Sequence, residues 1–315
     1  MNALQQEYHD ALSGMQGRDI LVIGDMVADI YLDGRISRIS REAPVLVLEQ
    51  AGEKVVAGGA ANVVNNIATL GGKVHAVGLV GRDKIADGLR AILAKNGADV
   101  RGLIADDSRP TISKTRIIAG GRATVSQQIV RIDRESKAPM APAVEAELRA
   151  YIKSVLPTVE GVVISDYGSG TVTEGLQTLL IAYCRAHDIP SIVDSRYAVR
   201  RFHGIGYVKQ NDAEIAAAKG VLVTRGELGM VLVEHGAVHE IPVSDKSEVF
   251  DVSGAGDTCV AAVILALAAG IAPATAARLS NIASGIAVRK LGTSTVSVRE
   301  LAAAIEKSRE EYTSK

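Results

Sequence analysis

The sequence predicts an α/β fold of three layers, with a mostly parallel central sheet between helices and a small β lid. Apolar strand-like runs that end in a polar residue alternate with helical patterns along most of the chain. Such alternation is typical of a parallel sheet covered on both faces. Two regions, 29–56 and 111–132, break it with β-type runs only. We therefore expect one domain over residues 1–315, with lid strands inserted from these two regions.

The predicted strands of the central sheet are short and almost wholly apolar. They cover 20–25, 74–80, 161–166, 191–194 and 220–224, and the helical patterns between them cover 60–70, 85–95, 143–156 and 173–187. Asp25, Asp166 and Asp194 stand where three of the strands end. One such Asp could be only a helix cap. Three of them predict a polar cleft, because ligands of parallel sheets bind beyond the carboxyl ends of the strands.

The lid is predicted from β-type runs at 30–32, 45–48, 115–118 and 128–132. We interpret them as antiparallel strands of a separate sheet; the alternative is that they are edge strands of the central sheet. An isolated small sheet has one bare face. We therefore expect the lid to pair with a second copy of the chain in a homodimer.

Composition excludes several classes of function. A net charge of −1, no Trp and two Phe give no basis for nucleic-acid binding. No apolar run reaches the roughly 20 residues of a membrane span, and the first residues lack a signal pattern. The two cysteines, Cys184 and Cys259, lie in separate apolar helical runs, which favours a reduced cytoplasm over a redox or metal motif.

The most informative segment is 251–258, which reads Asp-Val-Ser-Gly-Ala-Gly-Asp-Thr. A turn of Gly254, Ala255 and Gly256 lets backbone N–H groups converge on an anion, and the helix predicted from 259–269 adds its positive end. Asp257 could accept the proton of an attacking hydroxyl. An anion hole beside a base is suited to phosphoryl transfer to an alcohol. The alternative is a tight loop in which the Asp only caps the helix.

One connection in the chain is unusually short. Only residues 210–220 lie between Lys209 and Val221, whereas a parallel crossover with its helix needs about a dozen or more. Either the connection is tight, or residues between Glu214 and Val221 are missing from the sequence.

Two patterns in the chain resemble the ribokinase-like (PfkB) family of carbohydrate kinases. Residues 58–72, followed by 77–83, are similar to the amino-terminal signature of the family, and 251–258 to its carboxy-terminal signature. The resemblance implies a ribokinase-like fold and ATP-dependent phosphorylation of a sugar. Gly58 and Gly59 would let a substrate approach the backbone. Asp25, Asn62 and Asp166 would hold sugar hydroxyls.

The resemblance also implies a nucleotide and metal site. Asn211 and Glu214 match a motif that organises magnesium, here Mg²⁺ held through water. A further set would border the nucleotide: Asn211, Thr224, Gly226, Glu227, Gly229 and Asn281. Some family members hold a monovalent cation near the positions of Asp251 and Ser253, so K⁺ is an option.

Within the family, residues 35–45, 110–116 and 164–170 resemble bacterial heptose 7-phosphate kinases, which act in making ADP-heptose for lipopolysaccharide. The implied acceptor is D-glycero-β-D-manno-heptose 7-phosphate, with Lys114, Arg116 and Arg131 as candidates for its phosphate. Another sugar kinase, or a nucleotide-binding regulator, are the alternatives. Some relatives fuse a nucleotidyltransferase domain to the kinase; a chain that ends at Lys315 predicts the single-function kinase. The short connection after Glu214, and Gln210 where many members have Pro, depart from the family pattern.

Overall fold

The central sheet is mostly parallel, as predicted. The computed structural model describes residues 3–120, 126–196, 199–210, 218–243 and 249–313. Within them nine strands form one sheet in the order β13-β12-β11-β10-β9-β8-β1-β4-β5. The strands are β1 Asp19–Gly24, β4 Lys73–Val80, β5 Leu103–Ala105, β8 Gly161–Asp166, β9 Ser191–Ser195, β10 Tyr207–Gln210, β11 Gly220–Thr224, β12 Met230–Glu234 and β13 Ala237–Ile241. Only the pairs β11–β12 and β12–β13 of this sheet are antiparallel.

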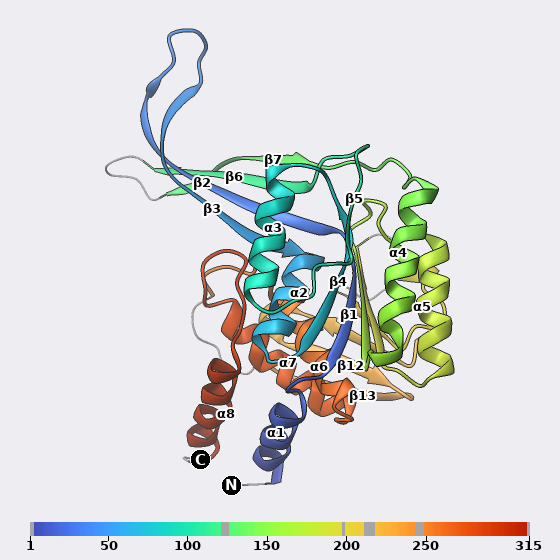
Figure 1. Ribbon diagram of the computed structural model, residues 1–315. Helices are drawn as coiled ribbons and strands as arrows, with labels where there is room; N and C mark the ends of the chain where they lie inside the picture. Colours follow the sequence, from blue (N-terminus) through green and yellow to red (C-terminus); the bar gives the residue numbers. More distant parts are fainter. Residues whose placement is uncertain (1–2, 121–125, 197–198, 211–217, 244–248, 314–315) are drawn as a thin grey trace.

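Helices cover both faces of this sheet and complete the three layers (Figure 1). On one side of the sheet lie α2 Ala60–Thr69, α3 Lys84–Lys95, α6 Ala255–Ala268 and α7 Pro273–Ala287, and on the other α4 Pro142–Val155 and α5 Glu174–Ala186. Helices α1 Ala3–Gly14 and α8 Val298–Thr313 pack on the first side against α6 and α7. Short 3-10 turns span Leu156–Thr158, Val199–Arg201 and Gly226–Leu228. Strand β1 alternates between the layers, because Ile20 and Val22 belong to the first core and Leu21 and Ile23 to the second.

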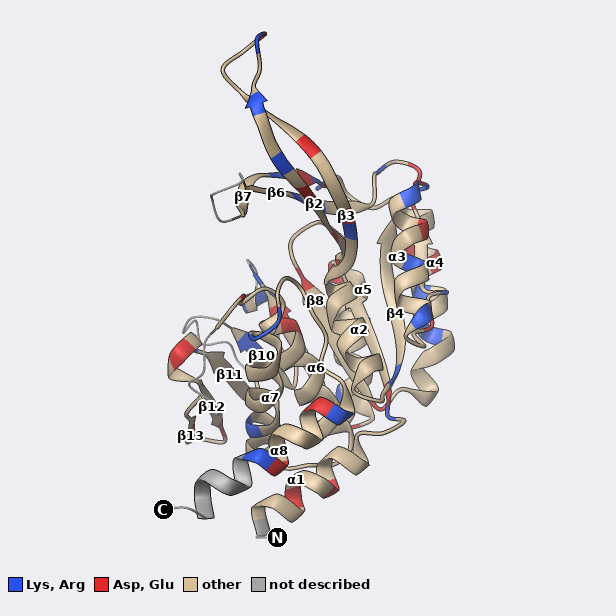
Figure 2. Ribbon diagram, turned by 90° about the vertical axis from the view of Figure 1, so that its left-hand side faces the viewer, with Lys and Arg blue, Asp and Glu red and all other residues tan. Residues whose placement is uncertain are grey.

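The lid is a separate four-stranded sheet of order β3-β2-β6-β7. Its strands are β2 Met26–Ile39, β3 Leu46–Gly59, β6 Ile112–Gly120 and β7 Gln127–Arg134. In Figures 1 and 2 the β2–β3 hairpin projects far from the body. The expectation of wholly antiparallel pairing was wrong, since β2 and β6 run parallel from Val27↔Ile112 to Arg35↔Gly120. The connection between them leaves the lid and passes through α2, β4, α3 and β5, which gives both strands the same direction.

The lid joins the body at two linked junctions. Asp25 alone separates β1 from β2, and β3 runs into α2 with no residue between Gly59 and Ala60. Gly59 has φ of 53°, a backbone conformation that favours glycine. The N–H of Ala60 donates to the carbonyl of Asp25 at 3.1 Å. The points where the chain enters and leaves the β2–β3 hairpin are therefore held together beside the carboxyl end of β1.

The short connection lies between two paired strands. β10 and β11 are parallel neighbours, with Tyr207 opposite Gly220. Residues 211–217 lie outside the described part, so the expectations for Asn211 and Glu214 stay predictions.

Candidate active site

Helix α6 begins earlier than the apolar run predicted. It starts at Ala255 rather than at 259, so the small residues of the motif form its first turn. Gly254 precedes it with φ of 80°. The N–H of Ala255 reaches the carbonyl of Val252 at 3.3 Å, while no hydrogen bond among the described residues engages the backbone N–H of Gly256 or Asp257. Two such amides at the positive end of a helix could donate to an anion, and the predicted anion hole stays a prediction.

The two glycines of this turn allow close packing. A Cβ on Gly254 would lie 2.6 Å from Asn62 Nδ2, and one on Gly256 would lie 2.7 Å from Lys209 Nζ. The backbone therefore favours glycine at Gly254, and the side chains that converge on this point leave little room beside either glycine.

Asp257 is buried at the centre of a polar cluster. Its Oδ2 accepts a hydrogen bond from Asn62 Nδ2 at 2.8 Å, and its Oδ1 accepts one from the Tyr167 hydroxyl at 3.0 Å. Burial raises the pKa of Asp257 to about 7, and the charge of Asp194 adds to the rise, whereas Asn62, Lys209 and Tyr167 oppose it. A carboxyl with a pKa near neutrality is suited to general base catalysis.

The cluster faces a cavity of about 1400 Å³. This cavity unites residues of the second signature with most of those predicted to meet the nucleotide. Its wall includes Gly254, Ala255, Gly256, Asp257, Asp166, Thr224, Gly226, Glu227, Gly229 and Asn281. The arrangement brings segments from β8, β11, α6 and α7 to one space, although their ligands stay predictions.

Two of the residues predicted to border the nucleotide have side chains that donate hydrogen bonds to backbone carbonyls. Asn281 donates from Nδ2 to the carbonyl of Pro242 at 2.7 Å, and the Thr224 hydroxyl donates to the carbonyl of Gln210 at 3.3 Å. Gly229 has φ of 83°, and a Cβ there would lie 2.2 Å from the carbonyl oxygen of Ile241. The cavity wall in this part is thus fixed by main-chain contacts.

Sequence reasoning missed an ion pair beside Asp257. Lys209 on β10 donates to Asp194 Oδ2 on β9 at 2.9 Å, and the Lys209 side chain is only 4% exposed. Both residues line the cavity next to Asp257. The available signal was a lone Lys within the buried strand β10. Tyr167 lies in the segment 164–170 noted for its resemblance to heptose 7-phosphate kinases, but nothing in the sequence linked its side chain to Asp257.

Asp25 and Asp166 organise loops at the carboxyl ends of β1 and β8. Asp25 has no exposed surface, and it accepts hydrogen bonds from the backbone N–H groups of Tyr167, Ser169 and Thr171 at 2.8 to 3.3 Å. Asp166 Oδ2 accepts from the Ser195 hydroxyl at 2.9 Å and from Arg201 at 3.0 Å. Both carboxylates have protein partners, and their proposed contacts with sugar hydroxyls stay predictions.

Close packing around the chain explains why glycines occupy the two positions before α2. A Cβ on Gly58 would lie 2.3 Å from Asp29 Oδ2, and one on Gly59 would lie 2.9 Å from the carbonyl oxygen of Asp25. Asn62 Nδ2 donates to Asp257, and Asn62 Oδ1 accepts from Asn66 at 3.1 Å. Its predicted contact with sugar stays a prediction.

The three basic side chains proposed to bind the substrate phosphate lie in the lid, apart from the residues that line the cavity. Lys114 and Arg131 both bind Asp133, at 3.1 and 2.8 Å. Arg116 pairs with Asp29, and its guanidinium lies 5.4 Å from the centre of the Tyr31 ring. Asp29 also accepts the Thr293 hydroxyl at 3.0 Å.

The described residues do not supply a metal-ligand set. Among them no group of three or more His, Cys, Asp or Glu side chains is arranged to hold a metal ion. The predicted Mg²⁺ ligands, Asn211 and Glu214, lie outside the described residues, so their role as ligands stays a prediction.

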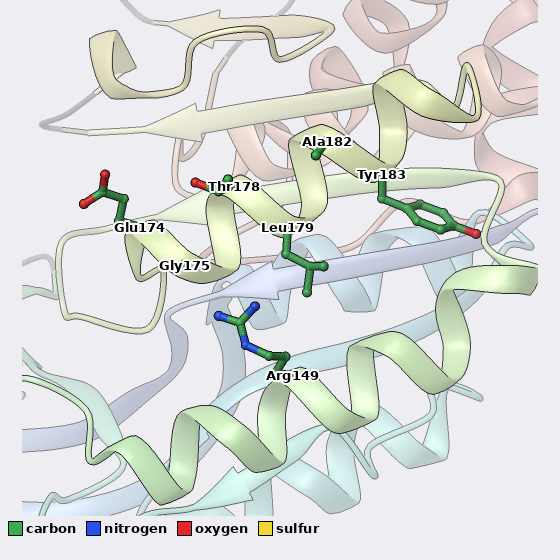
Figure 3. A pocket seen from close by; sticks show the side chains of 7 residues that line it. All are labelled: Arg149, Glu174, Gly175, Thr178, Leu179, Ala182 and Tyr183. Carbon is green, nitrogen blue, oxygen red and sulfur yellow. The ribbon is translucent and has the colours of Figure 1, made fainter.

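A second hollow lies between α4 and α5, on the opposite face of the sheet from α6. Arg149, Leu179 and Tyr183 are among its lining residues (Figure 3). It contains none of the predicted site residues.

No helix in the described part has the length and apolar character to cross a membrane.

The fold has three α/β layers and a β lid, and two backbone amides without a partner in the described part lie at a helix start beside a buried carboxyl. Such an arrangement is suited to phosphoryl transfer. The family model "pfkB family carbohydrate kinase" matches residues 18–222 and 208–300. The chain belongs to this family and is a carbohydrate kinase, so the predicted family and class of enzyme are confirmed. Kinases of this kind use ATP and a divalent metal ion.

The curated relatives that the chain matches are longer than the chain itself. "Bifunctional protein HldE" of Azorhizobium caulinodans is 39% identical over 323 residues, covering 94% of this chain and 66% of the relative. The protein of that name from Citrifermentans bemidjiense is 41% identical, with 90% and 63% covered. The chain thus spans somewhat less than two thirds of their length.

Solved structures confirm the fold. Phosphofructokinase-2 from Escherichia coli, in complex with substrates and products, superposes with a TM-score of 0.71 at 21% identity, covering 93% of this chain and 99% of that one. Ribokinase of Arabidopsis thaliana, complexed with ribose and ATP, gives 0.69 at 16% identity, with 92% and 99% covered.

Proposed function

We propose that the chain transfers the γ-phosphoryl group of ATP to the anomeric hydroxyl of D-glycero-β-D-manno-heptose 7-phosphate, giving the 1,7-bisphosphate. Family membership supports a sugar acceptor. The resemblance of residues 35–45, 110–116 and 164–170 to heptose 7-phosphate kinases supports this particular sugar, as does the likeness to proteins named HldE.

The observation that carries the proposal is the geometry at the start of α6. Asp257 is buried at the wall of the cavity, and the two unengaged amides of Gly256 and Asp257 stand beside its carboxylate. Charge that builds on a transferring phosphoryl group is stabilised by such fixed donors. A base placed at the same point can meet the attacking hydroxyl.

In the proposed reaction Asp257 accepts the proton and ADP is the leaving group. The anomeric oxygen forms a bond to the γ-phosphorus while the bond from that phosphorus to the β–γ bridging oxygen breaks. The hydroxyl proton passes to the carboxylate of Asp257, and ADP leaves with the electron pair of the broken bond. The nucleotide is proposed to lie along Thr224, Gly226, Glu227, Gly229 and Asn281, with its phosphates toward the start of α6.

Mg²⁺ is proposed to accompany ATP, with Asn211 and Glu214 reaching it through water. An ion held there would supply positive charge to the phosphates of ATP. We assign no role to K⁺. The carboxylate of Asp251 accepts the N–H groups of Ser253 and Gly292 at 2.8 and 3.0 Å, which orders the loop where some family members hold such an ion.

Arg116 is the lid cation proposed to meet the substrate phosphate. Its partner Asp29 is shared with Thr293, so the pair lies where the lid meets the loop after α7. Arg116→Ala should raise the KM of the sugar phosphate more than the KM of ATP. The matched control is Arg101→Ala, because this arginine lies outside the lid and its side chain is 77% exposed in a pair with Asp99. Equal small effects of Arg116→Ala on both KM values would remove it from the site.

We also propose a cytoplasmic homodimer formed through the lid. Exposed apolar side chains on the lid strands support it: Ile39 is 65%, Leu46 44%, Val130 44% and Ile132 54% exposed. Exposed apolar surface of this kind is typical of a contact between proteins. Sedimentation of the wild type beside a variant with Ile39→Glu and Ile132→Glu tests it; a monomeric wild type would contradict the proposal.

The substrate is tested by a coupled assay of ADP release with purified heptose 7-phosphate, fructose 6-phosphate and ribose. We expect kcat/KM for the heptose phosphate to exceed the others by at least about 100-fold, since a site whose polar groups are built for one substrate can reject analogues by about 10⁴-fold. A higher kcat/KM for another sugar would favour a different kinase of the same family. ATP binding without transfer to any sugar would favour a regulator.

A further inference from the structure

We propose that Tyr167 is a positioning residue for catalysis, whose hydroxyl orients the carboxylate of Asp257 and favours its deprotonated form. This inference rests on the proposed role of Asp257 as the base. It assigns to Tyr167 a function in the proton transfer rather than in holding the sugar or the nucleotide.

The carboxylate of Asp257 is held from two sides. The Tyr167 hydroxyl donates to Oδ1 at 3.0 Å, and Asn62 Nδ2 donates to Oδ2 at 2.8 Å. A carboxylate has about four acceptor positions, so both donors leave room for the hydroxyl of an incoming substrate. With one donor on each oxygen, rotation of the carboxylate about its bond to Cβ is opposed by both contacts.

Tyr167 is itself fixed by a buried anchor. Its backbone N–H donates to Asp25 Oδ2 at 2.8 Å, and the same carboxylate accepts from Ser169 and Thr171 two and four residues later. Gly59 packs at the ring, since a Cβ there would lie 3.4 Å from Tyr167 Cε2. The loop after β8 therefore holds the phenol ring in one place between Asp25 and the cavity.

The charged groups around Asp257 explain why the donor matters. Burial and the carboxylate of Asp194 on β9 both favour its protonated form, while Lys209 on β10 and the contacts of Asn62 and Tyr167 favour the charged form. Lys209 is already bound to Asp194. The Tyr167 hydroxyl is thus one of the few groups that stabilise the ionised base, because a hydrogen bond to a charged form lowers the pKa of an acid.

The test is Tyr167→Phe, which removes only the hydroxyl. We expect kcat to fall about tenfold, the effect of losing a hydrogen bond to a charged group, with the KM of ATP and of the sugar within twofold of wild type. The rising limb of kcat/KM against pH should move to higher pH. The matched control is Tyr183→Phe, whose hydroxyl donates to the carbonyl of Leu156 at 3.1 Å on the far face of the sheet (Figure 3). That variant should keep the wild-type profile.

A second measurement does not depend on turnover. The carboxyl ¹³C signal of Asp257, titrated in the protein without substrates, should show a higher pKa in Tyr167→Phe than in wild type and no change in Tyr183→Phe. In a background of Asp257→Asn, the further change of Tyr167 to Phe should alter kcat by less than twofold, because residues that act through one another are not additive.

Three results would overturn the inference: an unchanged pH profile and kcat in Tyr167→Phe, an unchanged titration of Asp257, or a rise confined to the KM of the sugar. The last would make Tyr167 a substrate contact. If Asp257→Asn itself remains fully active, the proposed base is wrong, and the titration still reports whether the hydroxyl controls the carboxyl.

Discussion

Replacing Asp257 by Asn should abolish most turnover while leaving the fold intact. The Tyr167 hydroxyl can turn and accept from the new amide group, and Asn62 can still donate to the remaining oxygen, so both contacts of 3.0 and 2.8 Å keep a partner. Because a neutral amide replaces a buried acid whose pKa is raised by that burial, we expect the free energy of unfolding to change by less than about 1 kcal/mol.

The loss of activity follows from the proton transfer. Without a base, kcat should fall about 10²- to 10⁴-fold, which corresponds to about 3 to 5 kcal/mol of transition-state stabilisation. The dissociation constant of ATP should change little, since the amides of the anion hole are retained.

The assay is ADP release under saturating ATP and sugar phosphate, with ATP affinity by calorimetry and stability by urea denaturation. Asp107→Asn is the control, because it removes the same charge from an exposed pair with Arg82, in which Asp107 is 72% exposed. A kcat of Asp257→Asn within tenfold of wild type would refute the role of the base.

Three further outcomes are expected. In the wild type, kcat/KM should climb as pH rises through about 7, where Asp257 loses its proton; a flat profile from pH 6 to 8 would contradict this. Gly254→Ala should lower the free energy of unfolding, measured by urea denaturation, by about 1 to 2 kcal/mol, because a φ of 80° disfavours residues other than glycine. The added methyl group should also displace Asn62 and so lower kcat. The hydrogen bond to Asp19 raises the pKa of His75 above 6.5. Protonated His75 therefore stabilises the fold fully below pH 6.5, and this stabilisation is lost as pH rises through the pKa of the folded state. The difference in unfolding free energy between wild type and His75→Gln should therefore shrink from pH 6 to pH 8, and a growing difference would refute it.

The sequence predicted the central sheet because its strands are continuous apolar runs with clear ends. Asp25, Asp166 and Asp194 were correctly expected at strand ends, and the strand order β9-β8-β1 brings them to one edge. The start of α6 was placed too late, because Ala255 and Gly256 are read locally as turn residues although they form the first helical turn.

Contacts between distant segments could not be predicted in the same way. The pairing of Asp257 with Asn62 and Tyr167 joins residues 195 and 90 positions apart, and no local pattern encodes such a pair. The parallel pairing of β2 with β6 depends on how the intervening chain travels around the body, which periodicity within either strand does not reveal. The hairpin of β12 and β13 was also missed.

The attachment of the lid connects its strands with the candidate active site. Asp25 is the single residue between β1 and β2, β3 passes directly into α2, and the two points are tied by the Ala60 N–H and the Asp25 carbonyl. The hairpin of two 14-residue strands is attached at the residue whose carboxylate accepts the backbone N–H of Tyr167. The Tyr167 hydroxyl donates in turn to Asp257, so two hydrogen bonds link the attachment point of the lid to the proposed base.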